Sequence, residues 1–271
     1  MPPRVFFYAP HPDDEILSMG LALCHFIASG YDVHVVSMSR GGVTAASIKL
    51  DGVQAATPKV CGWHGWIHNP EREGYTVPTD AEIGEARIKE TRSALGGLST
   101  ITPSAGLTQG GLFHHEGGLG IDFGLDEVQG VADCKNIMQE KIDAYPNSLH
   151  YTMSQTDRHP DHAACGLALQ ELKAENPALV NSRFFVSRLY WNYDVYPDVA
   201  TQPGLSWYGT SSNAFAARKS EYDARLRSRG IVSFSAWNPA GGAWAIGYHQ
   251  VAGQFASNFG PQATIANLWH S

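Results

Sequence analysis

Residues 4–39 read RVFFYAPHPDDEILSMGLALCHFIASGYDVHVVSMS, and this stretch decides the fold class. Residues 4–10 are a β-branched and aromatic run of strand length. Apolar residues then recur on one face of a helix that we expect over 14–28, and Gly30 ends it. Residues 32–39 read as a second buried strand. A strand, a helix and a strand in so short a stretch predict a βαβ unit and therefore a parallel sheet.

The remainder of the chain continues this alternation. Further helices are expected over 80–95, 125–144, 162–175 and 212–229, and further strands over 148–155 and 182–191. Residues 41–79 and 98–124 are rich in glycine without a clear period, so we expect long loops there. No repeat or linker divides the chain. We therefore predict a single doubly wound, Rossmann-like α/β domain over 1–271, with a mostly parallel sheet and long loops at the strand carboxyl ends.

Composition excludes several classes of protein. The 271 residues are 43% hydrophobic and 17% charged, which is typical of a globular domain. No apolar run reaches the about 18 residues of a membrane span, and the N-terminus is too short and acidic for a signal peptide. The net charge of −7 argues against a nucleic-acid partner. The scattered Cys24, Cys61, Cys134 and Cys165 indicate reduced thiols and a cytoplasmic location.

Two short segments that combine histidine with aspartate each follow a predicted strand directly. They are His11-Pro12-Asp13-Asp14-Glu15 and His159-Pro160-Asp161-His162. The carboxyl ends of parallel strands meet at the edge where open α/β sheets bind ligands, so we expect the two segments to converge. Aspartate also caps helices, but capping alone rarely explains two such segments after two strands of one chain.

The residue types in these segments fit a hydrolytic metal centre. Two imidazoles and one carboxylate make a three-ligand site with an open position, as in catalytic zinc sites. Zinc lowers the pKa of a bound water to about 7. A second carboxylate could act as the general base, and a further histidine could stabilise an oxyanion or protonate a leaving amine. We predict Zn²⁺ as the cofactor, with Fe²⁺ as the alternative because the same donors suit non-haem iron.

Together the two motifs resemble the PIG-L/LmbE-like family, whose members are zinc-dependent de-N-acetylases of N-acetylglucosamine conjugates. The segment between the motifs supports this, because Arg87-x-x-Glu90-x-x-x-Ala94-Leu95-Gly96 resembles the helix after the family's second strand. The resemblance spans roughly residues 4–175. It implies a metal site formed by His11, Asp14 and His162.

The resemblance also implies roles for the other residues of the motifs. Asp13 corresponds to the general base that activates water. His159 corresponds to the group that stabilises the oxyanion or protonates the departing amine, with Asp161 as its partner carboxylate. Glu15 corresponds to a supporting residue of the motif. Ser18 resembles a position near the sugar in some members.

The chain also departs from the family pattern. Many members have a glutamate in the turn after the second strand, where this chain has Ser39-Arg40-Gly41-Gly42. Arg40 could bind a substrate hydroxyl or an anionic group, or be solvated. Some members have a tyrosine where this chain has Asp157, which cannot donate a hydrogen bond when ionised. These departures bear on the expectation of a sugar substrate more than on the expectation of metal-dependent chemistry.

Several residues outside the motifs are further candidates. Trp63 and Trp66 lie in the loop after the second strand, with His64 and His68 beside them. Loops at this edge of such sheets form binding sites, so the two tryptophans could stack on a sugar, or they could anchor the loop. His249 could reach the site from the far side or simply pack in the core.

Two polar stretches are also candidates. Residues 114–116, His-His-Glu, could bind a metal, although adjacent residues rarely chelate one ion well and an exposed or cleft loop is the preferred interpretation. The basic stretch 218–229 reads as a solvated helix with ion pairs one turn apart.

These observations predict a metal-dependent hydrolase that cleaves an N-acyl amide, by preference N-acetyl, of an amino sugar conjugate or related small metabolite. One alternative is a tailoring amidase of natural-product biosynthesis that acts on a bulkier or non-sugar amide. Another is a sugar- or metabolite-binding protein without catalysis. The sequence lacks Gly-x-Gly-x-x-Gly after its first strand and lacks Gly-x-Ser-x-Gly, which argues against a dehydrogenase and a serine hydrolase. The expected partner is a small molecule, and the oligomeric state is not readable from the sequence.

Overall fold

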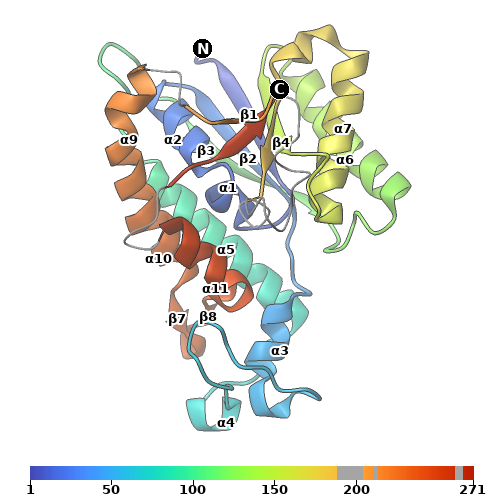
Figure 1. Cartoon of the computed structure of the whole chain (residues 1–271), viewed down its shortest axis with the longest axis vertical. Helices are drawn as coiled ribbons and strands as arrows, with labels where there is room; N and C mark the ends of the chain where they lie inside the picture. Colours follow the sequence, from blue (N-terminus) through green and yellow to red (C-terminus); the bar gives the residue numbers. More distant parts are fainter. Residues whose placement is uncertain (188–203, 210–212, 260–264) are drawn as a thin grey trace.

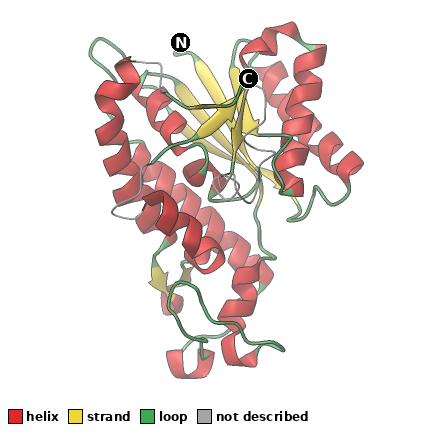
Figure 2. Ribbon diagram, in the orientation of Figure 1, coloured by secondary structure: helices red, strands yellow, loops and turns green. Residues whose placement is uncertain are grey.

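The computed structural model describes residues 1–187, 204–209, 213–259 and 265–271. Its strands are β1 (Arg4–Ala9), β2 (Asp32–Ser39), β3 (Leu112–Leu119), β4 (Leu149–Met153), β5 (Arg183–Val186), β6 (Ser206–Trp207), β7 (Trp237–Asn238), β8 (Ala243–Trp244) and β9 (Leu268–His270). Seven of them form one sheet in the order β3-β2-β1-β4-β5-β9-β6, and β7 and β8 pair separately. The sheet lies between two groups of helices (Figures 1 and 2).

The first five strands of the sheet run parallel, and the strand order reverses between β1 and β4. Strand β1 pairs with β2 on one side and with β4 on the other, with Val5 opposite Leu149 and Tyr8 opposite Thr152. The carboxyl ends of β1 and β4 therefore lie side by side, at the point where such sheets bind ligands. Strand β9 is antiparallel to both β5 and β6. A mostly parallel sheet flanked by helices confirms the predicted α/β fold class.

Helices cover both faces of the sheet. They are α1 (Asp14–Leu17), α2 (Gly20–Ala28), α3 (Ala45–Asp51), α4 (Pro70–Glu73), α5 (Asp80–Leu98), α6 (Glu127–Ala144), α7 (Pro160–Glu175), α9 (Asn213–Arg225), α10 (Val232–Phe234) and α11 (Ile246–Phe259). Helices α6 and α7 cover one face, and α2, α5 and α9 lie on the other (Figure 1). Side chains of β1 alternate between two cores, with Phe7 packed on the α2 side and Tyr8 on the α7 side. Burial on both faces explains the continuous apolar run of this strand.

The helix predicted over 14–28 is interrupted at Ser18 and Met19. Met19 is fully buried, and Leu226 approaches Gly20 so closely that a Cβ there would lie 2.7 Å from its methyl group. The changed direction lets α2 bury its apolar side chains while the short α1 stays at the end of β1.

Two stretches expected to be loops contain regular structure. Residues 41–79 include α3 and α4, and residues 98–124 include the edge strand β3. The interpretation of 114–116 as a loop is therefore wrong, because these residues lie on β3 and His115 Nε2 is 3.0 Å from His34 Nδ1. An edge strand need not be apolar on both faces, so the sequence carried no apolar run there.

Element boundaries differ in smaller ways. Helix α5 begins after the capping residue Thr79 as expected but continues through Gly96 and Gly97 to Leu98. Helix α7 begins at Pro160, two residues before its predicted start. Positions 188–191 of the predicted strand over 182–191, and position 212 of the last predicted helix, lie outside the described residues. Within the described ranges, no helix is both long and apolar enough to cross a membrane.

The C-terminal part of the chain docks on α5 through a buried carboxylate. Glu90 Oε1 accepts the backbone N–H of Ile246 at 2.6 Å, and Oε2 accepts that of Gly247 at 3.0 Å. These are the first two residues of α11, whose free N–H groups need acceptors. Helices α3 and α4 and the β7–β8 hairpin extend beyond the sheet next to this junction (Figure 1).

Burial raises the pKa of Glu90 to about 8. At pH 9, where Glu90 is ionised, we predict that Glu90→Gln lowers the free energy of unfolding by about 1–3 kcal/mol, because the amide leaves one buried N–H without an acceptor. Urea unfolding monitored by circular dichroism measures this change. The matched control is Glu85→Gln on the same helix, whose exposed carboxylate pairs with Arg40 and should change stability by less than about 0.5 kcal/mol. Equal effects of the two substitutions would contradict the docking role of Glu90.

Candidate active site

The structure brings the two histidine–aspartate segments together at the carboxyl ends of β1 and β4. His11, Asp13, Asp14, His159 and His162 all line one cavity of about 240 Å³. The described wall also includes the segment 43–45 and three residues of α11, which are Gln250, Val251 and Gln254. Its other described residues are Leu17, Arg87, Ile121, Asp122 and Ser187. The predicted convergence is therefore present.

Capping does not explain the aspartates of these segments. Asp13 precedes α1 but makes no capping hydrogen bond with its side chain. Helix α7 is capped by His159, whose Nδ1 accepts the backbone N–H of Asp161 at 3.2 Å. The side chains of Asp13 and Asp161 are therefore free to make other contacts.

Asp14 lies between two imidazoles. Its Oδ2 is 3.4 Å from His11 Nδ1 and 3.1 Å from His162 Nε2, and it also accepts the backbone N–H of His11 at 3.0 Å. Burial raises the pKa of Asp14, but the two histidines outweigh it and hold that pKa well below its usual range. Ligating nitrogens of His11, His159 and His162 lie within 4.8 Å of one another. This part of the cavity thus gathers imidazole nitrogens and a carboxylate oxygen, all atoms that bind divalent metals.

The carboxylate of Asp161 orients His11. Asp161 Oδ2 accepts a hydrogen bond from His11 Nε2 at 2.7 Å, and Oδ1 accepts the backbone N–H of Gly124 at 2.6 Å. An acceptor on Nε2 fixes the ring proton there and leaves the lone pair of Nδ1 directed at Asp14. The expected pairing of Asp161 with His159 is wrong, because the Asp161 carboxylate points away toward His11.

Asp157 contacts both histidines of the second motif, which the sequence did not predict. It accepts the backbone N–H groups of His159 at 3.1 Å and Ser187 at 3.0 Å, and its Oδ2 lies 3.3 Å from His162 Nδ1. Burial lowers the pKa of His162, but the carboxylates of Asp14 and Asp157 raise it well above its ordinary value. Metal-binding histidines usually have a carboxylate or carbonyl partner on their second nitrogen. The signal in the sequence is that Asp157 is a carboxylate shortly before His162.

Asp13 is held in an unfavourable backbone conformation. Its φ of 118° is rare for any residue except glycine and costs about 1–3 kcal/mol. Glu15 accepts the backbone N–H of Asp13 at 2.9 Å and the hydroxyl of Thr91 at 3.0 Å. Arg87 donates to Asp13 Oδ2 at 3.1 Å and to the carbonyl of Pro12 at 2.6 Å. These contacts hold the Asp13 carboxylate at the cavity.

Burial raises the pKa values of two carboxyls at this end of β1, Asp13 and Glu15. Burial raises the pKa of Asp13 to about 6, against the opposing effect of Arg87. Burial also raises the pKa of Glu15 to about 8. A carboxyl with a pKa near 6 can accept a proton close to neutral pH, as a general base must.

The four residues predicted to bind substrate are not among the described residues that line the cavity. Ser18 is buried, and Arg40 is exposed and paired with Glu85 and with Glu116, the latter at 2.8 Å. Trp63 and Trp66 both stack on His64, beside Cys61 and the helix α11. Their role in substrate binding stays a prediction.

Comparison with known proteins agrees with this geometry. The profile of the PIG-L family, described as GlcNAc-PI de-N-acetylase, matches residues 6–173, more than half of the chain. The chain belongs to the PIG-L family. Its sequence is 25% identical over 200 residues to the 1D-myo-inositol 2-acetamido-2-deoxy-alpha-D-glucopyranoside deacetylase of Mycolicibacterium smegmatis (strain ATCC 700084 / mc(2)155), and the match covers 70% of this chain. The chain spans about three-fifths, 59%, of that relative's length.

Solved structures of two deacetylases share the fold of this PIG-L family chain. The zinc-inhibited form of teicoplanin deacetylase has a TM-score of 0.50 at 17% identity and covers 98% of this chain and 97% of its own. The A40926 pseudoaglycone deacetylase has a TM-score of 0.51 at 18% identity, with coverage of 98% and 96%. The likeness therefore extends beyond the matched profile into the C-terminal part, including α11.

For this PIG-L family member, we predict that Arg87→Met lowers the free energy of unfolding by about 3–5 kcal/mol at pH 8, because the buried Asp13 loses its counter-charge. The loss should be smaller at pH 5. The pKa of Asp13 already lies near 6 with Arg87 present and rises further without it, so the carboxyl is neutral at the lower pH. Urea unfolding at the two pH values measures the difference.

Two variants serve as controls for this experiment. Arg92→Met removes an exposed arginine from the same helix, one that pairs with Glu116 at 2.6 Å, and should cost less than about 1 kcal/mol at either pH. The double variant Arg87→Met/Asp13→Asn should lose the pH dependence. A destabilisation by Arg87→Met that does not change with pH would contradict the ion pair with Asp13.

Proposed function

We propose that this PIG-L family member is a metal-dependent hydrolase that removes an N-acetyl group from a small amino sugar conjugate. The main evidence is that the Asp14 carboxylate lies between His11 Nδ1 and His162 Nε2 in the lining of the cavity. Membership in a family described as de-N-acetylases, and the named activity of the mycobacterial relative, support the class of reaction and of substrate.

The residues present fit a divalent metal ion. His11, Asp14 and His162 supply two imidazoles and one carboxylate, and each histidine has a carboxylate on its other nitrogen, Asp161 for His11 and Asp157 for His162. This is the donor set and supporting arrangement of catalytic zinc sites. When bound, a zinc ion supplies Lewis acidity and lowers the pKa of water to about 7.

Asp13 serves as the general base in this proposal. Its carboxylate lines the cavity beside Asp14, and Arg87 holds one of its oxygens. With a pKa near 6, Asp13 is mostly ionised at neutral pH and can take the proton of the attacking water. The same carboxyl can then return the proton to the departing amine nitrogen.

His159 serves as a hydrogen-bond donor to the oxygen of the scissile carbonyl. Burial lowers its pKa to about 4, and the neighbouring His162 and His11 act in the same direction, so the ring is neutral at neutral pH. Because Nδ1 accepts the backbone N–H of Asp161, the neutral ring carries its proton on Nε2. A neutral N–H donor at this position can stabilise negative charge that develops on the carbonyl oxygen.

Substitutions within the motifs distinguish the residue proposed as general base from the residues proposed as metal ligands. Asp13→Asn should lower kcat by about 10²–10⁴-fold, because the amide cannot accept the proton of water, while bound zinc stays unchanged. His162→Ala should lose activity together with the zinc ion of this cavity. Elemental analysis beside a deacetylase assay on N-acetylglucosamine conjugates measures both quantities, with Asp143→Asn on the exposed face of α6 as the matched control.

The outcomes of this experiment distinguish the alternatives. Equal zinc loss in Asp13→Asn and His162→Ala would contradict the division of roles. Full zinc content with turnover only of a bulkier amide would favour a tailoring amidase, and full zinc content without any turnover would favour a binding protein.

Asp161→Asn tests the orientation of His11 separately. If the oxygen of the new side-chain amide keeps the N–H of Gly124, its NH₂ group faces His11 Nε2 and forces the ring proton onto Nδ1, the atom that faces Asp14. Zinc affinity should therefore fall by about 10–100-fold. Competition with a chromophoric chelator measures the affinity, and an unchanged value in a folded variant would refute the role of Asp161.

A further inference from the structure

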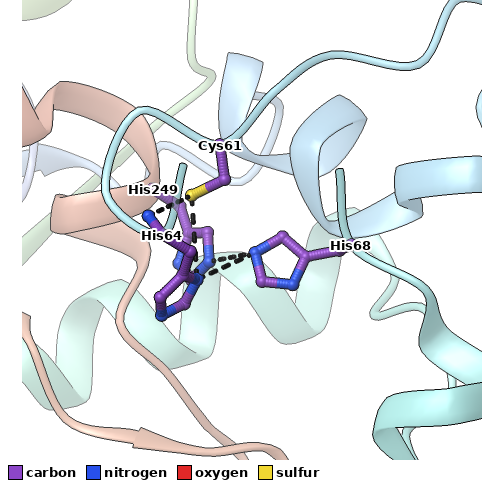
Figure 3. Close-up of side chains that lie close together, drawn as sticks. All are labelled: Cys61, His64, His68 and His249. Carbon is purple, nitrogen blue, oxygen red and sulfur yellow. Dashed lines mark hydrogen bonds between the residues drawn. The ribbon is translucent and has the colours of Figure 1, made fainter. Parts of the chain in front are cut away.

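A second group of side chains with metal-binding atoms lies outside the active-site cavity (Figure 3). Cys61, His64 and His68 come from the segment between α3 and α4, and His249 comes from the first turn of α11. One ligating atom from each of the four lies within 4.8 Å of the other three. We propose that this cluster binds a second metal ion, a Zn²⁺ held by one thiolate and three imidazoles.

Three distances in the cluster are close to those of a tetrahedral site. Bond lengths of about 2.0–2.1 Å to nitrogen and about 2.3 Å to sulfur place ligand nitrogens about 3.3 Å apart and sulfur about 3.6 Å from nitrogen. In the structure, His68 Nε2 is 3.0 Å from His64 Nδ1 and 3.1 Å from His249 Nε2. Cys61 Sγ is 3.8 Å from His64 Nδ1. These three distances lie within a few tenths of an ångström of the tetrahedral values, and the remaining pairs of ligating atoms lie within 4.8 Å.

The surrounding hydrogen bonds direct the lone pairs of two of these rings inward. His68 Nδ1 is 2.8 Å from the carboxylate of Glu73, and His249 Nδ1 is 3.0 Å from the carbonyl of Ala245. Both partners accept hydrogen bonds, so the proton of each neutral ring sits on Nδ1. Two Nε2 lone pairs then face each other at 3.1 Å. A cation between them turns this repulsion into coordination, and such outer acceptors are typical of metal-bound histidines.

Burial indicates a structural site instead of a catalytic one. Cys61, His68 and His249 have no exposed surface. Trp63 stacks on His64 at a ring distance of 4.1 Å, and Trp237 contacts the rings of His68 and His249 at 5.4 and 5.0 Å. Four protein ligands complete a tetrahedral shell and leave no position for water or substrate. The same enclosure argues against Cys61 as a nucleophile, which needs access to its substrate.

An ion in this cluster would fasten the segment 61–68 to α11 and thereby support the active-site wall. His249 is followed directly by Gln250, which lines the cavity and accepts the backbone N–H of Ala46 at 3.0 Å. Lys49 donates from the other side to the backbone carbonyls of His249 and Gln250. Loss of the ion should therefore loosen the junction between α3 and α11 as well as the segment itself.

Cobalt substitution tests the proposal independently of catalysis. The chain is stripped with a chelator and refilled with Co²⁺, and a near-ultraviolet band from thiolate-to-cobalt charge transfer reports coordination by Cys61. We expect the band in the wild type and in His162→Ala, because the active-site cavity offers no thiol among its lining residues. Cys61→Ala should lose the band and one zinc ion per chain. Cys24→Ala, the same change at another buried thiol, should lose neither.

Stability supplies a second readout. A chelator should lower the unfolding temperature of His162→Ala, which keeps the second ion, but not that of the double variant His162→Ala/Cys61→Ala, which keeps neither. If Cys61→Ala does not fold, His64→Gln replaces the partly exposed ligand and should also lose one zinc ion.

A wild type whose whole metal content depends on His162 would overturn the proposal, as would a Cys61→Ala variant that keeps the cobalt band. The first result would mean that hydrogen bonds alone hold the cluster together, and the second that another thiol binds the cobalt. Zinc that depends on Cys61 but not on His162 would instead support this second site and contradict the proposed active-site ligands.

Discussion

The parallel pairing of β1 with β4 is the constraint on which the site depends. Val5 lies opposite Leu149 and Tyr8 opposite Thr152, so the two strands end together. The segments that follow them are about 150 positions apart in the chain, yet His11 and Asp161 come within 2.7 Å of each other. No local sequence feature could achieve this contact. It results from the reversal of strand order at β1 and β4, which places two helix entrances at one edge of the sheet.

Each of the four buried aspartates at this edge has a basic side chain or a backbone N–H group as its partner. Asp13 faces Arg87, Asp14 faces two imidazoles, and Asp161 and Asp157 each accept backbone N–H groups as well as facing a histidine. An unpaired charge at such positions would cost several kcal/mol, so the set is interdependent. The histidines and aspartates of the two motifs therefore do two things at once. They provide atoms for a cation and for proton transfer, and they neutralise one another in the folded chain.

Much of the fold could be predicted because buried strands contain runs of apolar residues that are visible in the sequence. Strands β1 and β2 are buried along nearly their whole length, and their runs of valine, aromatic and other apolar residues made them predictable from the sequence. Strand β3 was not, because its residues 112–119 include two histidines and two glycines at a sheet edge. The distant Leu226 packs against Gly20 at the start of α2, a contact that no local sequence pattern indicates. The assignment of the whole chain to one domain stays a prediction.

The site was predictable in composition but only partly in its contacts. The two motifs indicated which residues would lie close together. Which carboxylate contacts which histidine depends on the orientation of the side chains, and the sequence does not give that orientation. The contacts of Asp157 with His162 and of Asp161 with His11 were therefore not predicted. The second cluster had one readable signal, the Cys61-x-x-His64-x-x-x-His68 spacing, which resembles half of a zinc site. Its fourth member, His249, lies 181 positions from His68 and is brought there only by the docking of α11 on α5.

Anomalous scattering tests the central claim most directly. Diffraction would be recorded on both sides of the zinc absorption edge from crystals of the chelator-stripped chain resupplied with Zn²⁺. The account predicts a peak at about 2.0–2.2 Å from His11 Nδ1, Asp14 and His162 Nε2, with Asp13 and His159 outside the coordination shell. The absence of a peak at the ends of β1 and β4, or a peak coordinated by His159 in place of Asp14, would contradict it.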